Sequence, residues 1–438
     1  MNYTIYPKPL SGVVSAPSSK SITHRVLICA SFSEGQTIIE NPLICDDTIT
    51  TIRSLENIGV AFKYSDNKLF INPPANYKLK SNIIDCKDSG TSIRMLLPIL
   101  GNIFKGITFC GSSRLIERLK TSNLNELNFE YLISENSITV KETNKINNLT
   151  LHDDNTSQII SGVLLSIAII RKQGILHIIS NNEELNPYII LTLNVLSSFG
   201  TKYEIKKDNN LFTITINKHL NEFSTSLTKP LLNSTHYYVE GDYSASSNLL
   251  ALGLLGENIV VKNLYKSSLQ GDKSFLDIIS KMNGELEIGI DAIKANKSCL
   301  IGTEVNLDHI PDLGPILIAL ASISKGTSTF TNYERLKIKE SNRFSRTIEI
   351  LKSMGADISY TKDKITVIGK QNLEGGVVVN PHNDHRLAMM ATVLTSKCLQ
   401  RVTILNAECV NKSYPNFWED YRKLKGLFVE ANLEESND

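Results

Sequence analysis

The sequence predicts an α/β (α+β) protein of two domains, built from six copies of one structural unit with three copies in each domain. Six apolar, helix-like runs each end in a polar turn that precedes a β-prone run. The turns are about 70 to 80 residues apart, near Gly35, Gly106, Gly174, Gly256, Gly326 and Gln400–Arg401. The runs are apolar nearly all round, which is typical of helices buried on every side. Most copies end in two short strands that read as an antiparallel hairpin.

The fifth copy shows the order of elements most clearly. Pro315 suits the first turn of a helix, where its missing N–H costs nothing, and Gly355 suits the end of a second helix. The predicted elements are a helix at 312–326, a strand at 327–332, a second helix at 345–354, and a hairpin at 357–360 and 364–368.

Simple alternation of helices and strands would instead predict an open parallel sheet. The hairpins count against that arrangement, and we therefore expect helices enclosed by sheets. The copies divide between the third and the fourth, where a polar passage with Pro230 runs from Lys218 to Val239. The opening strand, residues 3–6, precedes the first copy and has no predicted partner. A ligand is expected in the cleft between the two domains.

Composition excludes several functional classes. The 438 residues carry 46 basic and 45 acidic side chains, a net charge of +1, without the basic stripe of a nucleic-acid-binding protein. The seven cysteines form no Cys-x-x-Cys pair, so a zinc or dithiol site has little support. The N-terminus lacks signal-peptide character, and the longest apolar stretch, Ile159–Ile170, is too short to cross a bilayer. We expect a cytoplasmic protein with no membrane partner.

Residues suited to anions stand at or just before the start of each long apolar helix. A helix N-terminus presents unpaired N–H groups and a partial positive charge, so it readily binds phosphate. The helix starts are Lys20-Ser21, Gly90-Thr91-Ser92, Thr156-Ser157-Gln158, Ser244-Ala245-Ser246, Asp312, and Asp384-His385-Arg386. Six such starts directed at one place would bind a strongly anionic ligand.

Further cations accompany these starts, and each has an ordinary alternative explanation. Lys20 could equally be a solvated lysine, Arg114 a surface residue, and the charges of 333–343 an exposed face. His382 and His385 lack a third metal ligand, and the neighbouring Arg386 would repel a cation. The chain contains neither a Walker Gly-x-x-x-x-Gly-Lys-Ser/Thr motif nor a Gly-x-Ser-x-Gly nucleophile turn.

Taken together, the clusters resemble the 3-phosphoshikimate 1-carboxyvinyltransferase (5-enolpyruvylshikimate-3-phosphate synthase) family. Nine motifs occur in family order: Ser19-Lys-Ser-x-x-x-Arg25, Gly90-Thr-x-x-Arg94, Arg114, Ser157-Gln158, Glu240-Gly-Asp-x-Ser-x-Ser246, Pro311-Asp312, Lys339-Glu-Ser-x-Arg343, Asn383-Asp-His-Arg386 and Lys412.

The resemblance implies two inside-out domains of three β-α-β-α-β-β repeats each. They comprise residues 20–239, on the shikimate 3-phosphate side, and 1–19 with 240–438, on the phosphoenolpyruvate side, with the active site in the cleft between them.

The resemblance also implies the reaction and the residues that perform it. The family transfers the enolpyruvyl group of phosphoenolpyruvate to the 5-hydroxyl of shikimate 3-phosphate through a tetrahedral adduct, with no metal or organic cofactor. Shikimate 3-phosphate is expected to bind Lys20, Ser21, Arg25, Thr156, Ser157, Gln158, Tyr188, Asp312, Arg335 and Lys339. Phosphoenolpyruvate is expected to bind Lys20, Gly90, Arg114, Gln158, Arg343, Arg386 and Lys412.

The implied catalytic residues suit this chemistry. Asp312 would take the proton of the 5-hydroxyl, and Glu340 would protonate the methylene carbon of phosphoenolpyruvate. Lys20 and Lys412 would stabilise charge on the departing phosphate. Domain closure would exclude water and complete the site. A monomer acting on small molecules, without nucleic acid, is expected.

Several positions depart from the family pattern. Asp88-Ser89 replaces Asn-Ala, Thr156 replaces serine, Leu119 replaces proline, and Asn342 replaces aspartate. Leu185 stands where a shikimate-contacting serine is frequent, and it cannot form that hydrogen bond.

Two alternative functions fit the motifs less well. An enolpyruvyl transferase acting on UDP-N-acetylglucosamine would carry Lys-Asn at Lys20-Ser21 and a cysteine in a mobile loop. A non-catalytic relative would have lost Asp312 or Glu340, and both are present.

Overall fold

The computed structural model describes residues 1–120, 122, 124–143, 148–153, 156–170, 173–217 and 232–431. The chain divides into two compact units, which are described separately. Unit 1 is Met1–Pro17 with Glu240–Asp438, and unit 2 is Ser18–Val239. The expected boundary at Glu240 coincides with this division, whereas the expected one at Lys20 falls two residues after the observed start of unit 2. Most of the polar passage expected at the second boundary, residues 218–231, lies outside the described residues.

Unit 2 contains three four-stranded sheets, in the orders β14-β3-β5-β4, β6-β7-β9-β8 and β10-β11-β13-β12. Its strands are β3 (Thr37–Glu40), β4 (Ala61–Ser65), β5 (Lys68–Asn72), β6 (Ile83–Asp85), β7 (Ile107–Cys110), β8 (Phe129–Ile133), β9 (Ser137–Thr143), β10 (Asn148–His152), β11 (Gln173–Ile179), β12 (Lys202–Asp208), β13 (Leu211–Asn217) and β14 (His236–Tyr238). Its helices are α1 (Lys20–Ser31), α2 (Asp46–Glu56), α3 (Gly90–Ile103), α4 (Ser113–Lys120), α5 (Ser157–Ile170), α6 (Pro187–Ser198) and the 3₁₀ turn η1 (Leu124–Leu127).

Unit 1 repeats the plan, with sheets in the orders β16-β17-β15-β2, β18-β19-β21-β20 and β22-β23-β1-β24. Its strands are β1 (Tyr3–Ile5), β2 (Gly12–Ser15), β15 (Ile259–Lys262), β16 (Glu285–Ile288), β17 (Ala292–Asn296), β18 (Glu304–Asn306), β19 (Thr327–Thr331), β20 (Asp357–Tyr360), β21 (Lys364–Ile368), β22 (Val378–Val379), β23 (Val402–Ile404) and β24 (Phe428–Glu430). Its helices are α7 (Tyr243–Leu255), α8 (Phe275–Lys281), α9 (Gly314–Ser322), α10 (Arg343–Ser353), α11 (His385–Thr395) and α12 (Phe417–Lys423), with 3₁₀ turns η2 (Gly271–Ser274), η3 (Glu334–Ile338) and η4 (Ala407–Lys412).

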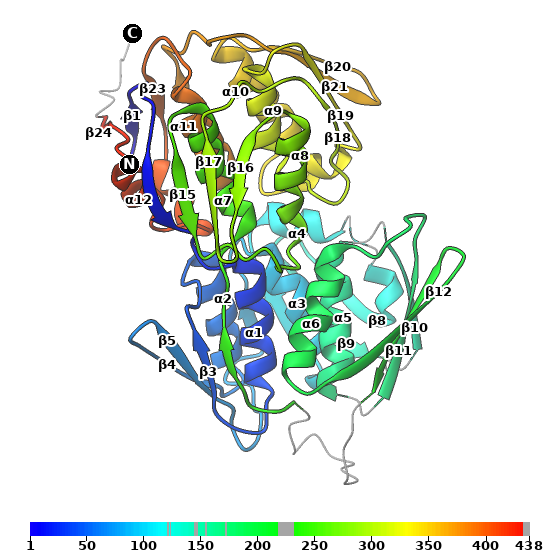
Figure 1. Cartoon of the computed structure of the whole chain (residues 1–438). Helices are drawn as coiled ribbons and strands as arrows, with labels where there is room; N and C mark the ends of the chain where they lie inside the picture. The colour runs from blue at the N-terminus through cyan, green and yellow to red at the C-terminus, as the bar shows by residue number, and fades with distance from the viewer. Residues whose placement is uncertain are drawn as a thin grey trace. The chain divides into compact units, whose positions relative to one another are not determined.

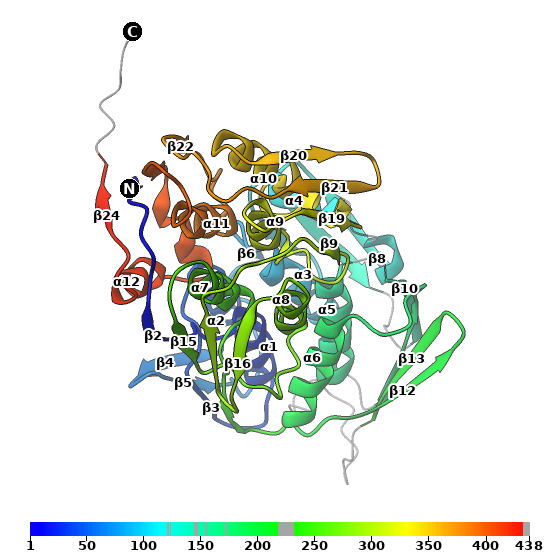
Figure 2. The ribbon, with the colours of Figure 1, turned by 45° about the horizontal axis from the view of Figure 1, so that its top comes forward.

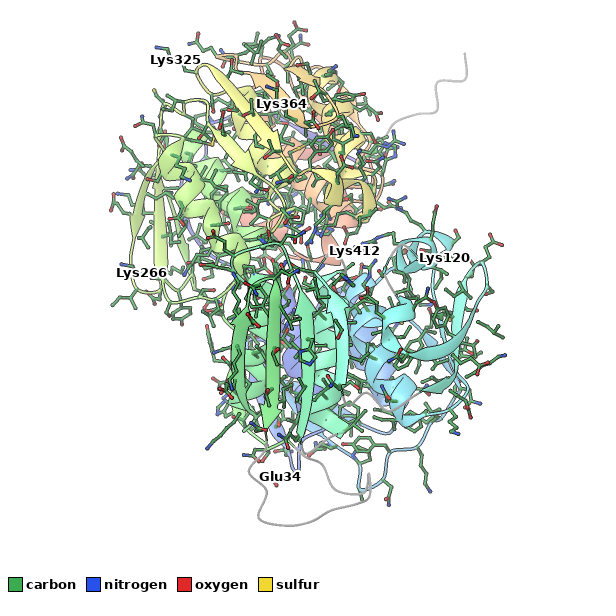
Figure 3. The ribbon with its side chains drawn as sticks, turned by 90° about the vertical axis from the view of Figure 1, so that its right-hand side faces the viewer. Glu34, Lys120, Lys266, Lys325, Lys364 and Lys412 are labelled. Carbon is green, nitrogen blue, oxygen red and sulfur yellow. The ribbon has the colours of Figure 1, made fainter. Side chains whose placement is uncertain are left out.

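Each sheet combines one parallel pair with antiparallel pairing, so the expected hairpins are confirmed and a purely parallel sheet is excluded. In the fifth copy, β18 pairs parallel with β19, β19 pairs antiparallel with β21, and β21 pairs antiparallel with β20. The hairpin β20–β21 has the predicted bounds. The exposed Lys325 and Lys364 mark this sheet in Figure 3.

Three strands join sheets far from their own place in the sequence. The opening strand β1 lies between β23 and β24 of the last sheet, pairing antiparallel with both. β2 pairs parallel with β15, and β14 pairs parallel with β3. One sheet of unit 2 and two sheets of unit 1 therefore contain a strand that is distant in sequence from its partners. No local sequence pattern predicts these pairings.

The first helix of each copy forms the interior of its unit. In unit 2, α5 is buried from Ile159 to Ile169, and it packs against α3 and α6. In unit 1, α7 and α11 are buried along their whole length. The sheets lie outside these helices, as Figures 1 and 2 show for β10–β13 beside α5 and α6. The expectation of helices enclosed by sheets is confirmed. In the described part of the chain, no helix is both long and apolar enough to span a membrane.

Gly162 allows a close approach of α5 to α3. A Cβ atom at this position would lie 2.7 Å from the carbonyl oxygen of Arg94 and 2.9 Å from Cα of Met95. We expect Gly162→Ala to lower the free energy of unfolding by about 1–3 kcal/mol, because a methyl group would force two backbones apart. Urea denaturation measures the change. The exposed Ser197→Ala on α6 is the control, with an expected effect below about 0.5 kcal/mol. Equal stability of the two variants would contradict this packing.

Candidate functional site

In unit 2, Arg25 is a buried cation that joins three helices. Its side chain is 2% exposed. Nε donates to Thr192 Oγ1 at 2.7 Å, Nη1 donates to the Ser21 carbonyl at 2.7 Å, and Nη2 donates to Ser161 Oγ at 3.0 Å. Nη2 also reaches the Tyr188 carbonyl at 3.2 Å, and the guanidinium lies 5.9 Å from the centre of the Tyr188 ring. Because the protein takes up most of its donors, Arg25 holds Ser21 and Tyr188 in place.

Lys20, the first residue of α1, is fixed by an ion pair. Its Nζ lies 2.9 Å from Asp47 Oδ2 on α2, and the two side chains are 14% and 6% exposed. Such a pair, largely removed from water, restricts the lysine to one direction. The sequence analysis did not single out Asp47, because an acidic residue at a helix start is usually explained by the helix dipole.

A second cationic group surrounds Gly90 at the start of α3. Nη1 of Arg94 donates to Gln158 Oε1 at 3.1 Å, and Gln158 Nε2 donates to Thr91 Oγ1 at 2.9 Å. A Cβ atom on Gly90 would lie 2.9 Å from Nη1 of Arg94 and 3.5 Å from Nη2 of Arg118. The glycine therefore keeps space open beside two guanidinium groups.

The arginine beside Gly90 is Arg118 and not Arg114. Both lie on α4, but Arg114 is exposed at its start, whereas Arg118, one turn later, is 9% exposed between Leu115 and Leu119 on the buried face. The Arg118 carbonyl also accepts a hydrogen bond of 3.1 Å from Nη2 of Arg94. This geometry places the Arg118 guanidinium beside Gly90, and the role expected of Arg114 stays a prediction. The amphipathic register of α4 was the signal that would have favoured Arg118.

The remaining expected residues of unit 2 stand at helix starts. Thr156 precedes α5 and accepts a long hydrogen bond, 3.4 Å, from the Ile159 N–H. Ser157, like Thr156, is half-buried, as is Tyr188 in the first turn of α6. Leu185 is buried in the apolar core, so it does not replace the serine hydroxyl.

In unit 1, the guanidinium of Arg343 gathers three carboxylates. The side chain is 1% exposed. Nη1 donates to Asp312 Oδ1 at 2.6 Å, Nη2 donates to Glu340 Oε2 at 2.5 Å, and Nε donates to Asp384 Oδ2 at 2.8 Å. The predicted catalytic pair, Asp312 and Glu340, is therefore brought together by one cation.

Two more cations converge on Asp312. Its Oδ1 lies 3.4 Å from Nζ of Lys339 and 3.6 Å from Nε of Arg386. Burial works against ionisation of Asp312, but the charges of Lys339, Arg386 and Arg343 outweigh it and hold the pKa of this carboxyl well below its ordinary value. Asp312 is consequently ionised at neutral pH.

Arg386 is in turn held from α7. Its Nη2 donates to Ser244 Oγ at 2.8 Å, and its Nη1 donates to the Ser244 carbonyl at 3.3 Å. The Ser244 hydroxyl donates to Asp272 Oδ2, a carboxylate that the sequence analysis did not identify. Only the packing of η2 against α7 reveals this contact.

Two expected residues lie nearby in the chain. Arg335, on η3, forms an ion pair with Asp308, with 3.2 Å between Nε and Oδ1. Lys412 is half-buried at the end of η4 and is labelled in Figure 3.

Among the described residues no group of three or more His, Cys, Asp or Glu could hold a metal ion. Two carboxylates beside several cations are suited to acid–base chemistry on an anionic ligand.

Comparison with known proteins identifies the family. The family model described as EPSP synthase (3-phosphoshikimate 1-carboxyvinyltransferase) matches residues 5–421. The chain belongs to this family. A 3-phosphoshikimate 1-carboxyvinyltransferase of Clostridium novyi is 34% identical over 446 residues, covering 99% of both chains. One of Clostridium kluyveri is 33% identical over 442 residues, covering 98% of this chain and 99% of the relative.

Solved structures share the fold. An EPSP synthase from Acinetobacter baumannii aligns with a TM-score of 0.75 at 20% identity, covering 98% of this chain and 100% of that one. The enolpyruvyl transferase NikO from Streptomyces tendae aligns with a TM-score of 0.77 at 15% identity, covering 98% of both chains. The two-domain enolpyruvyl transferase fold expected from the motifs is confirmed.

The structure explains one departure from the EPSP synthase family pattern and gives another a local role. Asn342 is the N-cap of α10, and its side-chain oxygen accepts a hydrogen bond of 3.2 Å from the Ser345 N–H. Asparagine caps a helix as well as aspartate does, so this contact does not need the missing charge. Ser89 caps α3, and its hydroxyl also accepts from Ser92 Oγ at 2.7 Å. The serine thereby adds a hydrogen bond directly before Gly90.

Removing Arg343 should expose the repulsion among the three carboxylates. We expect Arg343→Met to lower the free energy of unfolding by about 3–5 kcal/mol at pH 7, because it leaves buried charges uncompensated. In the wild type the low pKa of Asp312 contributes stability above the pKa of an unfolded aspartate, and this is lost on acidification. Without Arg343 the pKa of the Asp312 carboxyl rises, so the deficit should shrink towards pH 4. Urea denaturation at several pH values measures it.

The control for this variant is Arg346→Met on the same helix. Arg346 is 39% exposed and pairs with Glu349 at 2.6 Å, so its loss should cost less than about 1 kcal/mol. A deficit in Arg343→Met that is small, or equally large at pH 4 and pH 7, would contradict the electrostatic account.

Proposed function

We propose that this protein transfers the enolpyruvyl group of phosphoenolpyruvate to the 5-hydroxyl of shikimate 3-phosphate and releases phosphate. The step belongs to chorismate and aromatic amino acid biosynthesis. The observation that carries the proposal is the contact of Asp312 with three cations, one of which, Arg343, also binds Glu340, in a chain that matches the EPSP synthase family model from residue 5 to residue 421. The same match favours this reaction over transfer to UDP-N-acetylglucosamine.

Both substrates carry a phosphate and a carboxylate, so bringing them together requires cations. We propose that unit 2 holds shikimate 3-phosphate, through Lys20, Ser21, Thr156, Ser157, Gln158 and Tyr188, and that unit 1 supplies Asp312, Arg335 and Lys339. Phosphoenolpyruvate would bind Arg343, Arg386 and Lys412 from unit 1 and the group around Gly90 from unit 2. The active site would then form when the two units close.

The reaction would proceed by addition and elimination. Asp312 accepts the proton of the 5-hydroxyl while the oxygen attacks the central carbon of phosphoenolpyruvate, and Glu340 delivers a proton to the methylene carbon. The adduct then loses a methyl proton and phosphate, which restores the double bond. Lys20 and Lys412 stabilise the charge that develops on the departing phosphate. We propose that the enzyme acts as a cytoplasmic monomer on these small molecules alone.

The direct test is phosphate release from the purified protein supplied with both substrates. We expect release that requires both, and mass spectrometry should detect the enolpyruvyl ether. Glu340→Gln should lower kcat by about 100-fold or more with little change in KM, because a glutamine cannot deliver the proton. Glu349→Gln, an exposed change on α10, is the matched control. Phosphate release from phosphoenolpyruvate alone, or full activity of Glu340→Gln, would contradict the proposal.

The two arginines of α4 should differ in their effect on phosphoenolpyruvate. We expect Arg118→Met to raise the KM for phosphoenolpyruvate about 10-fold or more, since a guanidinium beside Gly90 would be lost. Arg114→Met should change it less than about 2-fold, because Arg114 is exposed at the start of the helix. Steady-state kinetics with saturating shikimate 3-phosphate measure both. The reverse ranking would restore the original expectation for Arg114.

A further inference from the structure

Asp272 is a buried carboxylate outside the residue set proposed above. It lies on η2, and its side chain is 1% exposed. Oδ2 accepts the hydrogen bond of the Ser244 hydroxyl, whereas Oδ1 is buried with no hydrogen-bond partner among the described residues. A carboxylate oxygen that is buried without a hydrogen bond lowers the stability of the folded state, so its presence calls for an explanation.

The charges around Asp272 do not compensate it well. Arg386 on α11 attracts it, but both terminal nitrogens of Arg386 donate to Ser244. Asp312, before α9, and Asp242, the N-cap of α7, repel it. On its own turn, Lys273 directs its ammonium to the Lys266 carbonyl at 3.1 Å. Burial and the repulsion by Asp312 raise the pKa of Asp272 to about 6, against the opposing effects of Arg386 and Ser244. At neutral pH this carboxylate therefore costs stability.

What Asp272 does provide is a direction for the Ser244 hydroxyl. A hydroxyl has one proton to donate, and the Ser244 hydroxyl donates it in the hydrogen bond to Asp272. The oxygen lone pairs of Ser244 are then left to accept from Nη2 of Arg386 at 2.8 Å, while the Ser244 carbonyl accepts from Nη1 at 3.3 Å. With Nε 3.6 Å from Asp312 Oδ1, the guanidinium plane is held from two sides.

We propose that Asp272 is a positioning residue which, through the Ser244 hydroxyl, fixes the guanidinium of Arg386 for binding an anion. The inference rests on the proposed function, in which Arg386 binds phosphoenolpyruvate. The destabilising effect of this buried carboxylate is then offset by a function, because it orients a binding residue to which it forms no direct hydrogen bond.

The first test is the kinetics of Asp272→Asn. We expect the KM for phosphoenolpyruvate to rise about 10-fold at pH 8, since the orienting charge–hydroxyl interaction is lost. The KM for shikimate 3-phosphate and kcat should change less than about 3-fold. Asp277→Asn, an exposed change of the same type on α8, should match the wild type.

If Asp272 only stabilised the fold, Asp272→Asn would have a lower Tm than the wild type at pH 8. The positioning role predicts the opposite. Because the native pKa of Asp272 lies above that of an unfolded aspartate, the protein loses stability as the pH rises from about 4, the unfolded pKa, to about 6, the native pKa. The Tm of Asp272→Asn should therefore be close to the wild-type value at pH 4 and exceed it by on the order of 1–3 °C at pH 8. The KM for phosphoenolpyruvate of Asp272→Asn, divided by that of the wild type, should fall towards one at pH 5.5. Titration of the substrate affects both proteins equally, so it does not change this ratio.

A double-variant cycle tests the route through the hydroxyl. Ser244→Ala should reproduce the rise in KM, and adding Asp272→Asn should cause no further rise, because the two residues act in series. Additive effects, an unchanged KM, or a lower Tm at pH 8 would each overturn the inference while leaving the proposed function intact. A wild-type protein that consumes no phosphoenolpyruvate in the presence of shikimate 3-phosphate would overturn both.

Discussion

The arrangement of the candidate site in unit 1 depends on one guanidinium group. Arg343 donates to carboxylates from three segments: Asp312 before α9, Glu340 before α10 and Asp384 at the start of α11. These carboxylates repel one another, and only a buried cation with donors in several directions can hold them together. A lysine, with a single point of charge, could not join them in a fixed plane. The proposed catalytic pair, Asp312 and Glu340, and the start of α11 are therefore joined electrostatically.

In unit 2, buried arginines also join several helices, but the hydrogen-bond acceptors are neutral oxygens. Arg25 joins α1, α5 and α6 through hydroxyl and carbonyl oxygens, and Arg94 joins α3, α4 and α5 through Gln158 and the Arg118 carbonyl. In both units the polar contacts lie at the starts of helices that are otherwise buried. The repeated fold thus concentrates unpaired N–H groups and side-chain cations at the same end of each helix set, which favours an anionic ligand.

The sequence was sufficient where the determining signal is local. Apolar helices with polar starts, glycine stops and short hairpins recur in every copy, so the repeat and the buried helices could be predicted. The partners of β1, β2 and β14 could not, because these strands pair with segments far along the chain. The same limit applies to the site. Asp312, Glu340 and Arg343 stand in a dense charged segment or at a helix start, whereas Asp47 and Asp272 look like ordinary helix-start acids until their partners are seen.

Arg114 shows a different limit, since two arginines one turn apart on α4 offer the same chemistry in sequence. Only the packing of Leu115 and Leu119 decides that Arg118 faces Gly90. The family resemblance led us to expect Arg114, and the chain departs from the family pattern beside Arg118, where leucine replaces a frequent proline. The register of a short amphipathic helix therefore carried information that neither motif order nor charge carried.

In the proposed function, the electrostatics of Asp312 would connect substrate binding with catalysis. In the structure Lys339, Arg386 and Arg343 all contact its carboxylate, and they keep its pKa well below the ordinary value. Such a carboxylate is a weak base. In the proposed reaction the same three cations bind the phosphates and carboxylates of the substrates, which would draw positive charge away from Asp312 and raise its pKa. Two anionic substrates would then do more than occupy the site: by competing for its cations they would make its base effective, and only when both are present.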